Sequence, residues 1–192
     1  MTELPDWFMP PLDGWSADDL DRLPPDAPRH LQIIDGALVV AAPQTLFHMA
    51  VISTLTTDLR AQAPAELAVV REMMVLLGRR QVPEPDLAVV NRSAVQDLTT
   101  TRYPASEVVL AVEVVSADSL IRDTERKPEL YAAAGIPHFW IVDREHGTTV
   151  VRRYELDPVT GSYVPTGVHR DQVRAEAPFP LELDLSEQAI AP

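Results

Sequence analysis

Hydrophobic and polar positions along the chain form short blocks that predict both strands and helices. Residues 31–40 are mostly apolar on either side of Asp35 and Gly36, and an Asp-Gly pair suits the tight turn of a β-hairpin. In residues 45–61 the apolar side chains recur every three or four positions, which is typical of an amphipathic helix. Apolar runs then predict three strands, at 67–77, 85–91 and 107–115.

The second half of the chain continues this succession of elements. We expect a helix over residues 125–134, with Pro128 in its first turn and Gly135 after its end, because proline is tolerated where a helix starts and glycine favours its stop. Further strands are predicted at 139–142, 148–156 and 163–168. Strands interspersed with helices indicate an α/β fold with a central sheet.

The two ends of the chain differ from its middle. Residues 1–28 are rich in proline and aspartate and predict an arm with one short helix, capped by Ser16. Residues 177–192 are acidic and are expected to be loosely held. We therefore expect one domain over residues 29–176, between these ends.

The composition is that of an ordinary globular protein, and it excludes several functions. The 192 residues are 46% hydrophobic and 23% charged, and no apolar stretch approaches the roughly 20 residues of a membrane span. The absence of cysteine excludes disulfides and thiolate metal sites, and together with the lack of a signal-peptide pattern it predicts a cytoplasmic protein. The net charge of −13 argues against a protein that coats nucleic acid, although an enzyme with bound divalent cations can still act on it.

Candidate chemistry comes from three charged residues in the middle of the chain. Lys127 is the only lysine among sixteen Lys and Arg residues, and an ammonium differs from a guanidinium in being a compact charge with a tunable pKa. Asp86 and Glu113 interrupt two of the apolar runs. Since alternate residues of a strand share a face, we expect Asp86 beside Ala88 and Glu113 beside Ala111, where a carboxylate is costly unless it is paired or binds a metal.

The spacing of these residues leaves two interpretations open. In the first, Asp86 and Glu113 hold Mg²⁺ together with a backbone carbonyl and waters, and Lys127 orients a nucleophile or stabilises charge on a phosphoryl group. In the second, Asp86 caps the end of a strand and Glu113 pairs with Arg71, so that both carboxylates are structural.

The sequence around these residues resembles a known family. Pro85-Asp86 is followed by Glu113-Val114-Val115-Ser116 and by a run that leads from Lys127 through Gly135-Ile136-Pro137-His138-Phe139-Trp140-Ile141-Val142 to Asp143. This pattern is most specific over 108–143 and extends back to about Leu31. It resembles the Uma-two family of restriction-endonuclease-like proteins, which belongs to the PD-(D/E)XK nuclease superfamily.

The resemblance implies a central mixed β-sheet flanked by helices, preceded by an N-terminal hairpin and helix. It implies Asp86 and Glu113 as metal ligands, with the carbonyl of Val114 completing the shell, and Mg²⁺ as the cofactor with Mn²⁺ as its substitute. The lysine of the superfamily motif would stand at Val115 and is expected instead at Lys127, in the next helix. The function implied is that of a metal-dependent endonuclease that hydrolyses phosphodiester bonds in DNA, as a homodimer if it cuts both strands.

Four further residues are candidate accessory members of the site. Gln32 stands where the family usually carries an acid. His48 matches a family histidine that either contacts the scissile phosphate or holds the hairpin. Glu84 is either an additional ligand or a solvated residue at the start of a strand. Tyr131 lies four residues after Lys127 on the same helix face and is expected to pack against the lysine stem.

Departures from the family pattern favour a second function. Gln32 brings no charge, His138 stands where the family tends to have glutamate, and Val115 replaces the motif lysine. With the charge of −13, these residues are also what a nuclease fold would show if it had lost its chemistry and served as a dimerising or binding protein. A phosphodiesterase with a substrate other than nucleic acid is a third function that the acidic composition permits.

Overall fold

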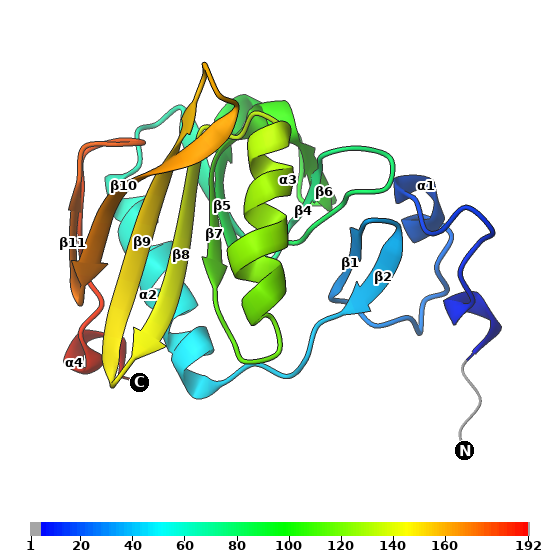
Figure 1. The fold of residues 1–192 in the computed structure, drawn as a ribbon, viewed down its shortest axis with the longest axis horizontal. Helices are drawn as coiled ribbons and strands as arrows, with labels where there is room; N and C mark the ends of the chain where they lie inside the picture. The colour runs from blue at the N-terminus through cyan, green and yellow to red at the C-terminus, as the bar shows by residue number, and fades with distance from the viewer. Residues whose placement is uncertain (1–4, 192) are drawn as a thin grey trace.

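A six-stranded mixed β-sheet forms the centre of the computed structural model, which describes residues 5–191 (Figure 1). In spatial order its strands are β10 (Ser162–Arg170), β9 (Thr148–Asp157), β8 (His138–Glu145), β7 (Val108–Val114), β5 (Leu87–Asn91) and β3 (Leu67–Arg71). β7 and β8 are parallel, and the other neighbouring pairs are antiparallel. The predicted α/β fold with a central mixed sheet is confirmed.

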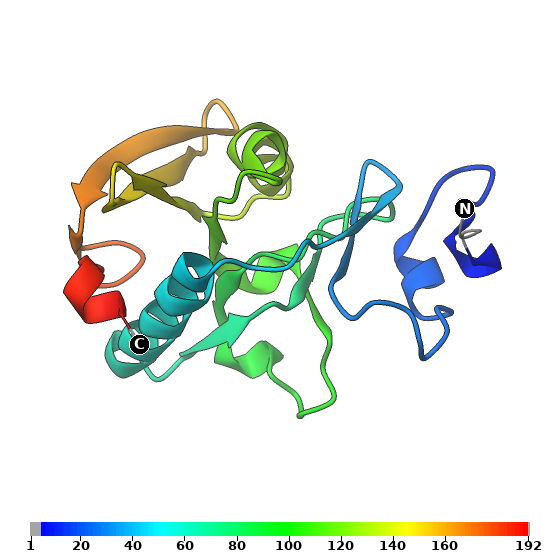
Figure 2. The same ribbon diagram turned by 90° about the horizontal axis from the view of Figure 1, so that it is seen from below.

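Helices cover both faces of this sheet, as the two ribbon views show (Figures 1 and 2). On one face lies α2 (Leu46–Gln62), which buries Val51 and Leu55 against apolar side chains of the strands. On the other face lies α3 (Lys127–Ala133), which buries Tyr131. No helix within residues 5–191 is long and apolar enough to cross a membrane.

The side chains of β7 alternate between the two faces. Leu110, Val112 and Val114 pack on the α2 side, whereas Ala111 packs on the α3 side. Glu113 follows this alternation and contacts side chains of α3. The face that we predicted for Glu113 is therefore correct, and it places a carboxylate between the sheet and a helix.

Smaller elements surround the sheet. The predicted hairpin forms as β1 (Leu31–Ile34) and β2 (Ala37–Val40), joined by Asp35 and Gly36 with positive φ angles, and the predicted short helix forms as α1 (Ala17–Leu20). The hairpin and α1 lie at the opposite end of the molecule from the C-terminal strands (Figure 1). The other short elements are η1 (Asp6–Phe8), β4 (Met74–Leu76), η2 (Arg92–Ala94), β6 (Arg102–Pro104), η3 (Ala105–Glu107), β11 (Gln172–Ala175), β12 (Leu181–Asp184) and α4 (Glu187–Ile190).

Two strand boundaries differ from the prediction. The run 67–77 is broken after β3, because Glu72 adopts a φ of 50° and the chain then turns into β4, which pairs with β6 outside the main sheet. β5 begins at Leu87, one residue after Asp86, whose backbone carbonyl accepts a hydrogen bond from the N–H of Glu72 at 3.2 Å. Asp86 therefore stands at the entry to the sheet rather than inside a strand.

The helix predicted over 125–134 begins earlier, at Leu120, and contains a π-helical turn, η4 (Arg122–Arg126). Pro128 accounts for the wide turn, because it has no N–H to donate and its ring crowds the carbonyl four residues before it. The N–H of Lys127 accordingly bonds the carbonyl five residues back. Pro128 lies in the first turn of α3, as predicted, but helical backbone precedes α3 from Leu120 onward.

The acidic C-terminal segment also differs from the prediction. Residues 177–191 are not loosely held, because β12 pairs with β11 and the side chains of Phe179, Leu183 and Leu185 are buried in the same core as α2. The alternation of apolar and acidic residues in β12 buries one face of this short strand and leaves the charges in solvent.

Leu185→Ala is expected to lower the free energy of unfolding by about 2–5 kcal/mol, because it removes a fully buried side chain and leaves a cavity. Urea denaturation measures this change. Val159→Ala is the control, since Val159 is 91% exposed. Equal stability of the two variants would contradict the packing of this segment into the core.

Candidate active site

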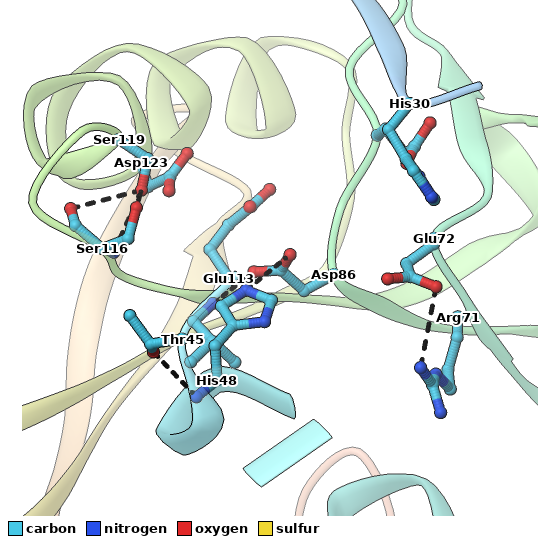
Figure 3. Close-up of polar contacts among 12 residues, drawn as sticks. His30, Thr45, His48, Arg71, Glu72, Asp86, Glu113, Ser116, Ser119 and Asp123 are labelled. Atoms are coloured by element: carbon cyan, nitrogen blue, oxygen red, sulfur yellow. Dashed lines mark hydrogen bonds and ion pairs between the residues drawn. The ribbon is translucent and has the colours of Figure 1, made fainter. Parts of the chain in front are cut away.

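A pocket of about 420 Å³ opens where β5 begins and β7 ends. Seven of the residues singled out from the sequence line it: Gln32, His48, Glu84, Asp86, Glu113, Val114 and Lys127. The eighth, Tyr131, reaches the pocket through its hydrogen bond to Glu113. The tertiary structure therefore brings all eight candidates to one place, part of which is shown in Figure 3.

The register of the sheet sets Asp86 beside Glu113. Leu87 of β5 pairs with Val112 of the antiparallel β7, so the next pair in this register would be Asp86 and Glu113. Oδ2 of Asp86 accepts a hydrogen bond from the N–H of Val114 at 2.6 Å. This bond fixes the Asp86 carboxylate against the end of β7.

Lys127 reaches the same point from α3. Its Nζ lies 2.7 Å from Oε2 of Glu113 and 3.2 Å from Oδ1 of Asp123. One turn further along the helix, the hydroxyl of Tyr131 donates to Oε1 of Glu113 at 2.7 Å. All four side chains are buried, and Glu113 has a donor on each of its oxygens. Tyr131 contacts the site through its hydroxyl, which goes beyond the packing role that we predicted.

Burial dominates the electrostatics of this cluster. Desolvation raises the pKa of Glu113 to about 8; the ammonium of Lys127 opposes this shift, whereas Asp123 and Asp86 add to it. Burial acts to lower the pKa of Lys127, but the attraction of Glu113 and Asp123 outweighs it and the pKa is raised. Lys127 therefore remains an ammonium, and Glu113 needs additional positive charge nearby to ionise readily.

His48 contacts Asp86 from α2, which lies on the face of the sheet opposite α3. Nε2 of His48 lies 3.1 Å from Oδ1 of Asp86, and both groups lie at the centre of Figure 3. Thr45 is the N-cap of α2, and its hydroxyl accepts a hydrogen bond from the N–H of His48 at 3.2 Å. The capped first turn of α2 thus fixes the backbone that carries the imidazole.

The second interpretation, in which Asp86 and Glu113 are both structural, agrees with the structure only in part. Asp86 does bond to backbone at the end of a strand, as that interpretation required. Glu113, however, does not pair with Arg71, which lies 3.6 Å from the carboxylate of Glu72. Glu113 is paired with Lys127 instead.

Gln32 and Glu84 lie on another wall of the pocket. Gln32 is buried, and its Oε1 lies 3.4 Å from the N–H of Glu84, which donates to it. The Glu84 carboxylate lies 2.7 Å from Nδ1 of His30, and burial raises its pKa although His30 opposes this shift. With a side chain that is only 10% exposed, Glu84 is not the solvated residue of our second interpretation.

Asp123 is a member of the site that the sequence analysis missed. It is buried in the π-helical turn, where its Oδ1 faces Lys127 but has no hydrogen-bond partner. A signal was available, since residues four apart on a helix lie on the same side and an acid at 123 suits a lysine at 127. We missed it because the predicted helix began at residue 125.

The donor set of the pocket suits a hard divalent cation such as Mg²⁺. Within the part of the chain that the structure describes, six carboxylates line the pocket against one arginine and one lysine. No three His, Asp or Glu side chains of residues 5–191 are arranged as a ready metal site. Mg²⁺, however, is commonly held by one or two carboxylates and waters, so Asp86, Glu113 and the carbonyl of Val114 fit it in number and kind. Asp123 is a further carboxylate of this pocket, and Nζ of Lys127, 3.2 Å from its Oδ1, is shared with Glu113.

Tyr131→Phe is expected to lower the free energy of unfolding by about 1–3 kcal/mol, because buried Glu113 loses one of its two donors. The ring itself is retained beside Phe139, with centroids 5.6 Å apart. Urea denaturation measures the effect. Tyr154→Phe is the matched control, and an equal change in both variants would contradict the importance of this hydrogen bond.

Comparisons with known proteins identify the family and the fold of the chain. The family model Uma2, described as "Putative restriction endonuclease", matches residues 17–188. Among solved structures, a "putative nuclease belonging to DUF820" from Anabaena variabilis ATCC 29413 is similar with a TM-score of 0.60 and 16% sequence identity, over 91% of this chain and 96% of that chain. No curated protein matches the chain. At this identity the structural likeness establishes a shared fold, and the matched segment includes all the candidate residues.

Proposed function

Because the chain belongs to the Uma2 family of restriction-endonuclease-like proteins, we propose that it is a metal-dependent endonuclease that hydrolyses phosphodiester bonds in DNA. One observation carries this proposal: Asp86, Glu113 and the only lysine of the chain meet in a single pocket, with Nζ of Lys127 2.7 Å from Glu113. Carboxylates that hold a divalent cation, next to an ammonium, are suited to the hydrolysis of a phosphodiester.

The residues have distinct roles in this reaction. Asp86, Glu113 and the carbonyl of Val114 would hold the Mg²⁺, for which Mn²⁺ would substitute. When bound, the cation lowers the pKa of a coordinated water and neutralises charge on the phosphoryl group. Lys127 orients the attacking water and stabilises the negative charge that develops on the phosphate. His48 keeps the Asp86 carboxylate in place, as hydrogen-bond partners of metal ligands commonly do.

The acidity of the pocket supports a requirement for a cation. Six carboxylates among the described lining residues would repel the phosphates of DNA. A divalent cation offsets this repulsion, so the overall charge of −13 is compatible with a DNA substrate at this site.

A specific observation favours the competing function, that of an inactive nuclease fold that serves as a dimerising or binding protein. Gln32 is buried in the pocket wall and brings no charge, and both oxygens of Asp86 already have protein partners. In this function Glu113 and Lys127 form a buried structural pair, and no cation is needed.

Millimolar Mg²⁺ or Mn²⁺ is expected to raise the melting temperature, and to raise it more at about pH 8.5 than at about pH 6.5. Glu113 sets the direction of this pH dependence. Its raised pKa keeps the carboxyl group protonated at the lower pH, so the cation must displace a proton there. Thermal melting measures the shift, and cleavage of plasmid DNA with and without EDTA is followed in parallel. Absence of both a metal-dependent shift and cleavage would favour the inactive binding protein.

The partners in this proposal are DNA and a second copy of the chain. A nuclease that cuts both strands of a duplex uses two sites, and a symmetric dimer supplies them. Light scattering in solution should give twice the mass of one chain, and the mass of a single chain would contradict the dimer. The cysteine-free sequence supports a cytoplasmic location.

A further inference from the structure

Arg122 presents an unused hydrogen-bond donor to the active-site pocket. It lines the pocket from the π-helical turn, and its Nε is buried without a hydrogen-bond partner. Oδ1 of the adjacent Asp123 lies 3.6 Å from this nitrogen, which is too far for a hydrogen bond. Nε itself is buried, so the outer part of the guanidinium, on a side chain that is 26% exposed, is the part that can reach a ligand in the pocket.

Ser116 and Ser119 offer a second donor to the same pocket. Their Oγ atoms are 3.0 Å apart, and Oγ of Ser119 also accepts the N–H of Ser116 at 3.1 Å. One of the two hydroxyl protons forms the hydrogen bond between the Oγ atoms. The only acceptor for the other proton is the carbonyl of Ser116, which lies 3.4 Å from Oγ of Ser119. Figure 3 shows the two serines side by side next to Asp123. One O–H donor can therefore turn toward a ligand at little cost.

The positive charge of Arg122 favours an anion in its own part of the pocket, whose other described lining residues include six carboxylates. Among the described residues that line the pocket, Arg122 and Lys127 are the only arginine and lysine, and Lys127 is already held by Glu113 and Asp123. The side chain of Arg122 is 26% exposed, so part of its guanidinium remains accessible. A planar guanidinium matches the oxygens of a phosphate, and serine hydroxyls are common partners of the same group.

We propose that Arg122, Ser116 and Ser119 form a phosphate-binding subsite that takes a backbone phosphate of the substrate strand. The proposal rests on the proposed nuclease function, and it separates two tasks within one pocket. Arg122 binds and positions the strand, whereas Lys127 acts at the reacting phosphate beside Glu113.

Inorganic phosphate tests the subsite without divalent cations. Because the carboxylates of the pocket weaken the binding of an anion when no cation is present, phosphate is used on the order of tens of millimolar, and wild type is expected to melt at a slightly higher temperature than in chloride of equal ionic strength. Arg122→Gln is expected to lose this difference, and Arg122→Lys to keep part of it, because the charge remains while the planar fork is lost. Arg174→Gln is the matched control: it removes the same charge at a side chain that is 78% exposed, and it should respond like wild type.

Binding of a DNA oligonucleotide in EDTA tests whether the ligand is a strand phosphate. Arg122→Gln is expected to bind about tenfold more weakly than wild type, equally for different sequences, and to reduce the dependence of log affinity on log salt concentration by about one. Loss of the phosphate effect with unchanged oligonucleotide binding would assign the subsite to free phosphate and overturn our assignment.

Two other outcomes overturn the subsite altogether. One is a wild-type protein whose melting does not respond to phosphate, and the other is an Arg122→Gln variant that responds as wild type does. Neither experiment measures cleavage or contains metal. Failure of the nuclease function, seen as the absence of metal-dependent cleavage, is therefore distinguishable from failure of the subsite.

Discussion

Glu113→Gln is expected to lower the rate of metal-dependent DNA cleavage by about 10³-fold or more while the protein remains folded. A neutral amide is a poor ligand for Mg²⁺, so the reacting phosphate loses the cation. Glutamine has nearly the same shape, and its carbonyl can still accept a hydrogen bond from Lys127 or Tyr131. Cleavage of a DNA substrate in Mg²⁺ measures the rate, and circular dichroism checks the fold.

The choice of glutamine over alanine follows from the burial of the pair. Glu113→Ala would leave the buried ammonium of Lys127 without its closest partner, and a loss of activity could then reflect unfolding. Glu129→Gln is the matched control, because it makes the same substitution on α3, the helix that carries Lys127, at a side chain that is 68% exposed. Full activity of Glu113→Gln would end the assignment of Glu113 as a ligand. Asp86→Asn is expected to behave as Glu113→Gln does.

Lys127→Arg separates the ammonium from positive charge in general. A guanidinium is larger, and it does not fit a position where Nζ lies within 3.2 Å of two carboxylates. We expect cleavage to be lost although the charge is kept. Retention of the wild-type rate would show that only positive charge is needed at this position.

At about pH 9, where the raised pKa of about 8 leaves Glu113 ionised, Lys127→Met is expected to lower the free energy of unfolding of the metal-free protein by about 3–5 kcal/mol, because it leaves Glu113 and Asp123 buried without the ammonium that both contact. Methionine keeps the length and apolar character of the stem, so the effect reports the charge. Urea denaturation in EDTA gives the free energies. The variant therefore loses both stability and activity, which makes it a poor test of catalysis by itself.

The double variant Glu113→Gln with Lys127→Met tests whether the pair acts as a unit. Replacing both charges of a buried pair is often close to neutral, so the double variant is expected to recover at least about half of the loss seen in Lys127→Met. Asp123 remains charged in both proteins and limits the recovery. Additive losses from the two substitutions would mean that Glu113 and Lys127 are not coupled.

Several features of the site could be predicted from residues close in sequence. The alternation in 107–115 placed Glu113 on the face opposite Leu110 and Val112, as the structure has it. The spacing of four residues placed Tyr131 on the same side of the helix as Lys127. Both depend only on the regular periods of strands and helices, which the backbone imposes locally.

Other features depended on contacts between distant segments. The C-terminal segment around Leu185 was predicted to be loosely held because it is acidic. Its apolar side chains nevertheless complete a core built by α2 and the sheet. The π-helical turn that carries Arg122 and Asp123 is too short to produce a repeating hydrophobic pattern in the sequence. Its only sequence signal is Pro128, which we took as the start of a helix.

By itself the sequence determined the order of the main strands and helices, the face on which Glu113 lies, and the identity of a single ammonium in the chain, because these follow from local periodicity and composition. Only the tertiary structure decided that Asp86, Glu113 and Lys127 meet. Their meeting depends on the antiparallel register of β5 with β7 and on the packing of α3 against that sheet face. The tertiary structure also decided their burial, and with it the raised pKa of Glu113, because desolvation depends on all the segments that surround a group and not on its neighbours in sequence.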